Sequence, residues 1–346
     1  MSLDAFRDRI LARAPLRVRG GGSKDFYGGP LTGDVLEVGD YRGIVSYEPS
    51  ELVMTARAGT PLAELEAALA VCGQWMAFEP PGFGGAATLG GAVASGLSGP
   101  GRASCGALRD FVLGVKIMDG EGRVLTFGGQ VMKNVAGFDV SRLLAGSLGT
   151  LGLILEVSFK VLPIPVAQAS LRFQLPQDRA LDLMNRWAGR PLPVTATSWE
   201  DQVLTVRLAG AEAAVRSACG TLGGERLPEA AAHWAGLKEQ SHAFFAGEAP
   251  LWRLSVPSTT ASLTLLERTL IEWGGAQRWL RGDWEPVQLR ELAQRAGGHA
   301  TRFRGGDRAA GVFAPLPAPL ADIHRRLKSA FDPHGIFNPG RLLPGL

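Results

Sequence analysis

The chain has 346 residues, of which 46% are hydrophobic and 20% are charged, and its net charge is +3. This length allows two or three domains, and the mild, dispersed charge argues against nucleic acid and anionic membranes as partners. The three cysteines form no C-x-x-C pair, so the sequence predicts neither an iron–sulfur cluster nor a zinc knuckle. The charged N-terminal residues and the glycine-rich stretch at 80–101 predict no signal peptide and no membrane span, so we expect a cytoplasmic protein.

The first half of the chain predicts short strands and turns with few helices. Alternating and apolar runs favour strands at 16–18, 34–38, 53–56, 111–118, 124–127 and 152–161. Thr60 as N-cap and Pro61 at the first helical position open a helix that runs to Ala70, and a short helix is expected at 139–144. The strands at 111–118 and 124–127 predict a β-hairpin with a four-residue loop.

After Pro163 and Pro165 the pattern alternates between strands and helices, and tryptophan becomes frequent. We expect strands at 171–175, 203–208, 251–256, 276–280 and 300–303, and helices at 178–188, 211–222, 229–245, 258–273, 286–296 and 319–331. This order suits an antiparallel sheet with helices on one face, and hence an α+β fold. We predict domains at 1–165 and 166–318, with a helix and tail at 319–346 that return to the first domain.

Two glycine-rich segments suggest a bound dinucleotide. One runs from Gly82 to Gly106, and the other, Arg19-Gly20-Gly21-Gly22-Ser23-Lys24, follows a predicted strand. Without Cβ atoms the backbone can lie against a flat or charged ligand, and successive N–H groups can form a nest for phosphate oxygens. Taken alone, the shorter segment also fits a plain surface turn, but the pairing of the two segments favours a cradle.

The sequence does not favour a Rossmann nucleotide site, a serine-hydrolase site or a metal site. Gly82–Ala87 has the form G-x-G-x-x-A, yet no strand precedes it and the residues after it are too rich in glycine for a tightly packed helix. Ala145 breaks the G-x-S-x-G pattern around Ser147. The five histidines show no metal-ligand spacing, so we predict no metal site.

Motifs in the first 165 residues and the last 20 follow one another in a specific order. They are Arg19–Ser23, Pro80-Pro81-Gly82, Ala87–Gly91, Ser95-Gly96 with Arg102 and Gly106, Lys133-Asn134 with Gly137-Phe138-Asp139, Gly146–Gly152, and Phe331–Gly340. In this order they resemble flavoproteins of the vanillyl-alcohol oxidase type, the p-cresol methylhydroxylase (PCMH) superfamily. The resemblance implies a two-part PCMH-type FAD-binding domain and an antiparallel-sheet, ferredoxin-like cap domain.

The resemblance also implies FAD as the cofactor and assigns residues to it. The loop at 19–24 would wrap the pyrophosphate, while 88–91 and 95–96 would run beside the pyrophosphate and the isoalloxazine edge. The full set of residues implied to bind the cofactor is Arg19, Gly20, Gly21, Gly22, Ser23, Lys24, Pro80, Gly82, Thr88, Leu89, Gly90, Gly91, Ser95, Gly96, Arg102, Gly106, Gly149, Gly152, Ile154 and Asn338.

Two departures from the family pattern affect its functional residues. Ser23 stands where members with covalently attached flavin often carry His, so we expect non-covalent FAD. Leu148 stands where related D-lactate dehydrogenases usually have Glu. Those enzymes also carry a histidine-rich metal and substrate site in the second half, and this chain has no matching pattern there. Autonomous substrate oxidation is therefore an open question.

Within this superfamily the chain looks like the E subunits of bacterial glycolate oxidases, notably at 251–255 and 273–279. That resemblance implies oxidation of a small 2-hydroxy acid such as glycolate to glyoxylate. It also implies a larger FAD-binding D-type subunit and an iron–sulfur subunit as partners, through which the chain could lie at the inner membrane. A non-catalytic electron-relay or structural subunit and a stand-alone D-2-hydroxy-acid dehydrogenase are the alternatives. Candidates for holding the carboxylate are Arg253, Arg278, Arg281, Arg302 and Arg304.

Overall fold

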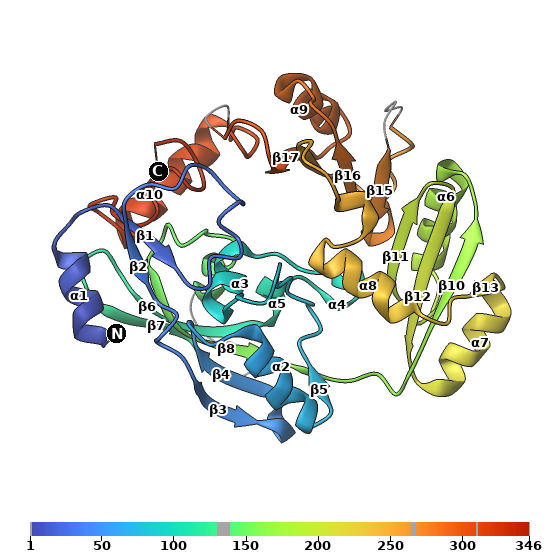
Figure 1. Ribbon diagram of the computed structural model, residues 1–346, viewed down its shortest axis with the longest axis horizontal. Coiled ribbons are helices and arrows are strands. Elements are labelled where there is room, and N and C mark those ends of the chain that lie inside the picture. The colour runs from blue at the N-terminus through green and yellow to red at the C-terminus, as the bar shows by residue number, and fades with distance from the viewer. Residues whose placement is uncertain (1, 130–138, 264–267, 309–310, 346) are drawn as a thin grey trace. The chain divides into compact units, whose positions relative to one another are not determined.

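The computed structural model describes residues 2–129, 139–263, 268–308 and 311–345. The chain divides into two compact units, each built from segments that are distant in the sequence (Figure 1). The first unit contains Met1–Leu97, Ala107–Pro163 and Arg308–Leu346. The second unit contains Ser98–Gly106 and Ile164–Asp307.

A five-stranded antiparallel sheet is the centre of the first unit. Its strands are, in spatial order, β3 (Ile44–Glu48), β4 (Val53–Arg57), β8 (Leu153–Lys160), β6 (Val112–Met118) and β7 (Val124–Gly128). The central strand β8 is largely buried, as its apolar run predicts. Two smaller sheets pair β1 (Leu16–Arg19) in parallel with β2 (Asp34–Glu37), and β5 (Gln74–Trp75) with β9 (Leu162–Pro163).

Residues from both ends of the chain hold β1 in place. Phe6 and Ile10 pack in one apolar cluster with Leu16 and Phe337, and Leu16 also forms a β-bridge with Phe337. The strand that leads into the first glycine loop is therefore fixed by the C-terminal tail. The helices of this unit are α1 (Leu3–Leu11), α2 (Leu62–Val71), α3 (Leu89–Ser95), α5 (Leu108–Phe111) and α10 (Ala318–Phe331), with 3-10 turns at Pro49–Glu51 and Ser141–Leu144.

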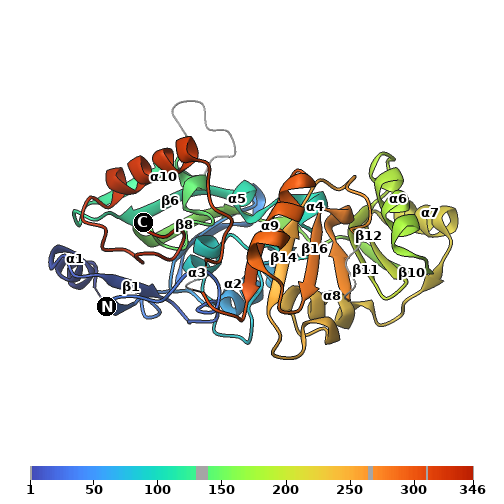
Figure 2. The same ribbon diagram turned by 90° about the horizontal axis from the view of Figure 1, so that it is seen from above.

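The second unit is built on an eight-stranded antiparallel sheet (Figure 2). Its strands are, in spatial order, β13 (Glu225–Arg226), β10 (Ala167–Gln174), β12 (Val203–Gly210), β11 (Val194–Glu200), β15 (Thr269–Glu272), β16 (Gln277–Arg281), β14 (Leu251–Ser255) and β17 (His299–Arg304). Its helices are α4 (Arg102–Cys105), α6 (Gln177–Ala188), α7 (Glu212–Leu222), α8 (Ala230–Glu239) and α9 (Pro286–Arg295), with 3-10 turns at Ala243–Phe245 and Trp273–Gly275.

Helices cover both faces of this sheet, so the expectation of helices on one face was wrong. Leu171 and its register partner Val206 pack with α6 and α7 in one apolar cluster. The neighbouring Ser170 points to the other face because side chains alternate along a strand. There Ser170 accepts a hydrogen bond from Nε1 of Trp234 on α8, at 2.9 Å. The face of β10 that carries Ser170 is therefore covered by α8.

Two predicted helices of the second unit were also wrong in part. The helix expected at 258–273 is absent from the described part of that range, where Thr269–Glu272 forms β15 between β11 and β16. Pairing on both edges outweighs the weak local preference for a helix. The helix expected at 229–245 ends at Glu239, because Gln240 adopts a left-handed conformation. The strands β11 and β13 were not foreseen.

Two local details of the first unit differ from expectation. Thr60 does not cap α2, which begins at Leu62 after Pro61. Its Oγ1 instead accepts a hydrogen bond from the N–H of Gly43 at 2.9 Å. Threonine side chains can bond to backbone groups outside the helix in place of capping it. The hairpin loop spans 119–123, the five residues that the expected strand bounds leave between them, so the count of four was wrong; within it the carboxylate of Asp119 accepts hydrogen bonds from the N–H groups of Glu121 and Arg123.

Candidate cofactor site

The two glycine-rich segments pack directly against each other. A Cβ atom at Gly21 would lie 1.4 Å from the carbonyl oxygen of Ala86, and one at Gly20 would lie 2.3 Å from Oγ1 of Thr88. Neither position has room for a side chain, since real Cβ contacts do not come this close. The loop after β1 and the segment before α3 therefore form one continuous surface.

The loop after β1 presents a run of backbone N–H groups. Within the part of the chain that the structure describes, the N–H groups of Gly20, Gly21, Gly22 and Ser23 donate to no protein acceptor. All four residues line a cleft of the first unit. Gly22 has a φ of +72°, which costs glycine little and turns the loop. Successive N–H groups exposed in this way bind anionic oxygens.

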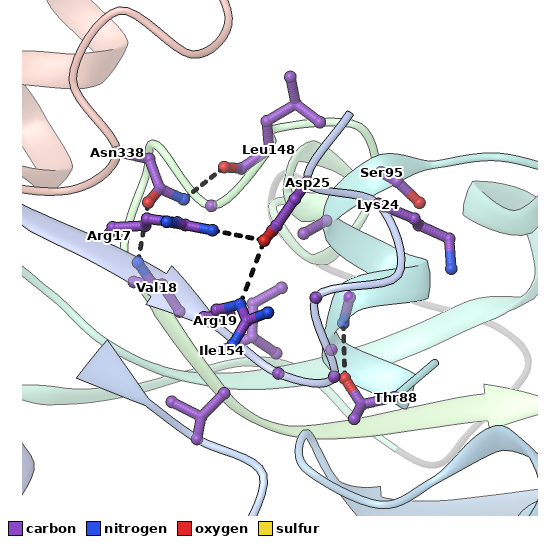
Figure 3. A pocket seen from close by; sticks show the side chains of 18 of the residues that line it. Arg17, Val18, Arg19, Lys24, Asp25, Thr88, Ser95, Leu148, Ile154 and Asn338 are labelled. Atoms are coloured by element: carbon purple, nitrogen blue, oxygen red, sulfur yellow. Dashed lines mark hydrogen bonds and ion pairs between the residues drawn. The ribbon is translucent and has the colours of Figure 1, made fainter. Parts of the chain in front are cut away.

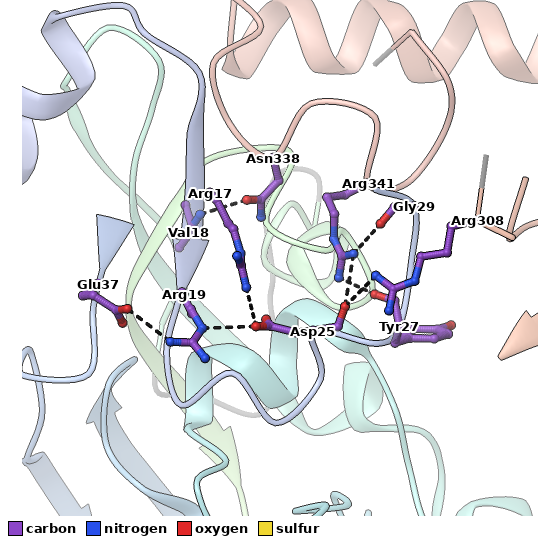
Figure 4. Close-up of polar contacts among 10 residues, drawn as sticks. All are labelled: Arg17, Val18, Arg19, Asp25, Tyr27, Gly29, Glu37, Arg308, Asn338 and Arg341. Atoms are coloured by element: carbon purple, nitrogen blue, oxygen red, sulfur yellow. Dashed lines mark hydrogen bonds and ion pairs between the residues drawn. The ribbon is translucent and has the colours of Figure 1, made fainter. Parts of the chain in front are cut away.

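The charges that line the cleft favour an anion. Among the described residues, its lining contains the cations Arg17, Arg19, Lys24 and Arg341 and one carboxylate, Asp25. Asp25 pairs with both strand arginines: Oδ2 accepts from Arg17 and, at 3.1 Å, from Nε of Arg19 (Figure 4). The hydrogen bond to Asp25 raises the pKa of Arg19, so this guanidinium stays charged. The excess of positive charge suits a diphosphate.

Small and apolar groups form the remaining walls of the cleft (Figure 3). They come from α3 and from the segments around β2, β4 and β8: Leu31, Val38, Ala58, Thr88, Gly90, Gly91, Ala94, Ser95, Leu148, Gly149, Gly152 and Ile154. The cleft encloses about 800 Å³ of space, part of which is open solvent. Apolar walls beside a cationic loop match a ligand with flat rings and a charged centre.

The C-terminal tail completes the lining. The side-chain Oδ1 of Asn338 accepts a hydrogen bond from the N–H of Val18 at 2.8 Å, and its Nδ2 donates to the carbonyl oxygen of Leu148 at 2.7 Å (Figure 3). Arg341 donates to the carbonyl oxygen of Tyr27, and burial lowers the pKa of this arginine to about 10 (Figure 4). The tail thereby cross-links segments of the cleft that are far apart in the sequence.

Most residues expected to bind the cofactor line this cleft. They are Arg19, Gly20, Gly21, Gly22, Ser23, Lys24, Thr88, Gly90, Gly91, Ser95, Gly149, Gly152, Ile154 and Asn338. The others lie elsewhere: Pro80, Gly82, Leu89 and Gly96 in the first unit, and Arg102 and Gly106 in the second. Within the second unit, the guanidinium of Arg102 is 4.6 Å from the ring centre of Trp273. The motif residues Lys133, Asn134, Gly137 and Phe138 fall outside the described residues.

Sequence analysis missed several residues of the lining, namely Arg17, Val18, Asp25, Leu31, Val38, Ala58, Ala94, Leu148 and Arg341. Alternation along β1 could have found Arg17, because it shares a strand face with Arg19 next to the glycine loop. Arg341 follows Asn338 closely, and its N–H donates to the Asn338 carbonyl oxygen. The apolar residues carry no signal of their own in the sequence.

The arginines proposed to hold a substrate carboxylate are mostly engaged within the second unit. Four donate hydrogen bonds there: Arg278 to the carbonyls of Gly275, Thr260 and Ala261, Arg281 to those of Phe245 and Ala249, Arg302 to that of Asp307, and Arg304 to the side chain of Gln240. Burial also lowers the pKa of Arg278 to about 10. The guanidinium of Arg253 lies 5.4 Å from the ring centre of Phe303.

The described residues contain no group of three or more His, Cys, Asp or Glu placed to hold a metal ion. No described helix combines the length and the apolar character needed to cross a membrane.

Comparison with known proteins identifies the ligand that the cleft suits. Residues 9–128 match the FAD binding domain family. The glycolate oxidase subunit GlcE of Escherichia coli K12 is 48% identical over 340 residues, which cover 98% of this chain and 96% of that protein. This chain belongs to the glycolate oxidase subunit GlcE family. It is an FAD-dependent oxidoreductase of the PCMH type, as its motifs imply.

More distant relatives match less than half of the chain. The glycolate oxidase subunit GlcD of Bacillus subtilis is 31% identical over 46% of this chain and 34% of its own length. A D-lactate dehydrogenase of Archaeoglobus fulgidus is 27% identical over 43% of this chain and 33% of its own. A solved alkyldihydroxyacetonephosphate synthase shares the fold, with a TM-score of 0.67 and 14% identity over 98% of this chain and 75% of that one. The expected fold class is thereby confirmed.

The residues of the cleft fit FAD. The exposed N–H groups at 20–23 and the surrounding cations supply donors and charge for a diphosphate, as the contacts above show. Glycines and short side chains leave the backbone accessible to flat rings.

Proposed function

We propose that this chain is the FAD-binding subunit of a glycolate oxidase complex that oxidises a small 2-hydroxy acid, with glycolate converted to glyoxylate. The observation that carries the proposal is the match over nearly the whole length of both chains to the Escherichia coli subunit. The cation-rich cleft supports it. A larger D-type flavoprotein subunit and an iron–sulfur subunit are the proposed partners. The complex works in the cytoplasm and reaches the inner membrane only through those partners.

The residues of the cleft have distinct proposed roles. When bound, FAD supplies a two-electron acceptor for the hydrogen on the hydroxyl-bearing carbon of the acid. The N–H groups of Gly20–Ser23 and the guanidinium of Arg19 would hold the diphosphate. Gly149, Gly152 and Ile154 would lie along the adenine side. Because Ser23 offers no imidazole for a bond to the flavin, attachment is non-covalent.

A second candidate is an electron relay that binds FAD without oxidising substrate itself. The arrangement of the second-unit arginines favours it. Arg278 and Arg281 use their donors on carbonyl oxygens of their own unit, and Arg302 and Arg304 are engaged there as well. A guanidinium committed in this way has fewer donors to offer the two oxygens of a carboxylate. In this version the D-type partner oxidises the acid.

Anaerobic reduction of the flavin separates these two functions. The purified chain, loaded with FAD, is mixed with glycolate or D-lactate without oxygen, and the flavin absorbance is followed. Bleaching of the isolated chain shows autonomous oxidation. Bleaching only after the D-type subunit is added shows the relay. Absence of bound flavin in a well-folded preparation would contradict both.

A further inference from the structure

Lys328 is the one residue of α10 that is buried, and all fourteen residues of that helix are described. Helices of globular proteins normally bury an apolar stripe. Here Leu320 and Ile323 are 41% and 60% exposed, while the lysine side chain is only 7% exposed. Burying a charge costs free energy, whereas burying an apolar group stabilises the fold, so hydrophobic packing does not account for this lysine.

The ammonium group of Lys328 has three acceptors. Nζ donates to the carbonyl oxygen of Thr150 at 2.7 Å, to that of Phe337 at 2.9 Å and to Oδ2 of Asp332 at 2.6 Å. Three is the full donor capacity of an ammonium group. Burial lowers the pKa of Lys328, and the Asp332 carboxylate opposes that shift by favouring the charged form. The lysine thus joins α10, the tail and the loop that precedes β8.

Asp332 extends this junction into the tail. Its carboxylate, in a residue that is 2% exposed, accepts from the N–H groups of Ile336 at 3.1 Å and Phe337 at 2.8 Å. These contacts fix the turn between α10 and Asn338. The pair of Lys328 and Asp332 therefore sets where the chain emerges at Phe337.

Both attachment points of Lys328 lie beside the hydrogen bonds of Asn338. Phe337 directly precedes Asn338, and Thr150 lies two residues after Leu148. The Nδ2 of Asn338 donates a hydrogen bond to the carbonyl oxygen of Leu148 at 2.7 Å. Asn338 and Leu148 both have positive φ, +43° and +52°, a left-handed conformation that asparagine tolerates and that is strained for leucine. Strained conformations persist where surrounding contacts enforce them. Lys328 supplies such contacts on both sides, yet does not itself line the cleft.

We propose that Lys328, with Asp332, is a positioning pair for FAD that fixes the distance between the tail at Asn338 and the loop at 148–150. The inference rests on the proposed function in that FAD is the ligand of the cleft. Loss of the pair removes no residue that lines the cleft, because neither Lys328 nor Asp332 belongs to its lining. It removes the restraint that holds the 148–150 loop and β1 together around the cofactor.

The test compares K328M with K116M, a matched control in the same unit. Lys116 forms a 2.7 Å ion pair with Glu156 on the sheet, and neither residue lines the cleft. FAD is titrated into each flavin-free protein, with flavin fluorescence and the visible spectrum as readouts. We expect K328M to weaken FAD binding about tenfold or more and to shift the flavin spectrum, whereas K116M stays within about twofold of wild type. The salt dependence of FAD binding should not change in K328M, because Lys328 is not among the cations that line the cleft.

Two results would contradict the argument, each at a different step. A folded K328M protein with wild-type FAD affinity and spectrum would overturn the inference. A wild-type protein that binds no FAD would instead contradict the proposed function. If K328M does not fold, D332N gives a milder change of the same pair, and amide exchange of the wild-type protein needs no variant. FAD should then protect the amides at 148–150 and 336–338, and unchanged protection there would refute the positioning role.

Discussion

Replacing Gly21 by alanine tests the contact between the two glycine segments. The new methyl group would lie 1.4 Å from the Ala86 carbonyl oxygen, where ordinary contacts begin at 3.4 Å. The loop or the 86–88 segment must therefore move by about 2 Å, since a backbone carbonyl cannot rotate away as a side chain can. A misplacement of about 1 Å at a catalytic site can already cost on the order of 100-fold in rate, and we take a penalty of this size for the geometry of the cofactor site. We expect FAD affinity to fall at least about 100-fold, or about 2.7 kcal/mol.

The assay is FAD titration of the flavin-free G21A protein, with thermal unfolding measured in parallel. Gly39 provides the control, because a Cβ atom there meets nothing within 4 Å and its φ is not positive. G39A should bind FAD as wild type does. If G21A binds FAD as tightly as G39A, the two segments do not form the cofactor surface and the argument for the cleft fails.

The other predictions concern charge, attachment and pH. R19M should weaken FAD binding and reduce its salt dependence, measured by titration at two ionic strengths, because it removes one cation from the cleft; unchanged affinity would exclude Arg19 from the diphosphate site. Acid or denaturant should release all yellow colour from the holoprotein, and colour retained on the precipitated chain would disprove non-covalent attachment. Burial, with the nearby charges of His242 and Arg172, lowers the pKa of His233 from 6.5 to about 4. The unfolded chain therefore binds the extra proton first, so stability should fall as pH drops from 6.5 to 4. Denaturant midpoints across this range should flatten in H233N, and an equally steep H233N profile would count against His233 as the source.

The sequence predicted the parts of the fold and site that depend on local patterns. The apolar run of β8 and the alternation of β2 are visible in single segments. The glycine loop after β1 was also expected, because only glycine tolerates such close backbone approach. Its partner at Ala86 could not be foreseen as a contact, since nothing local records which segments meet.

The errors arose where distant contacts overrule local preference. Residues 269–272 form a strand because β11 and β16 flank them, although the surrounding segment has a helical composition. Arg341 enters the cleft because the tail returns to β1, where Phe337 forms a β-bridge with Leu16, more than 300 residues earlier in the sequence. Single-sequence patterns cannot reveal such long-range pairing.

The most direct test of the central claim is the FAD content and affinity of the purified, folded chain. Isothermal titration of the flavin-free protein should show one FAD bound per chain, with affinity that weakens as salt is raised. A folded chain that binds no FAD at any salt concentration would contradict the account.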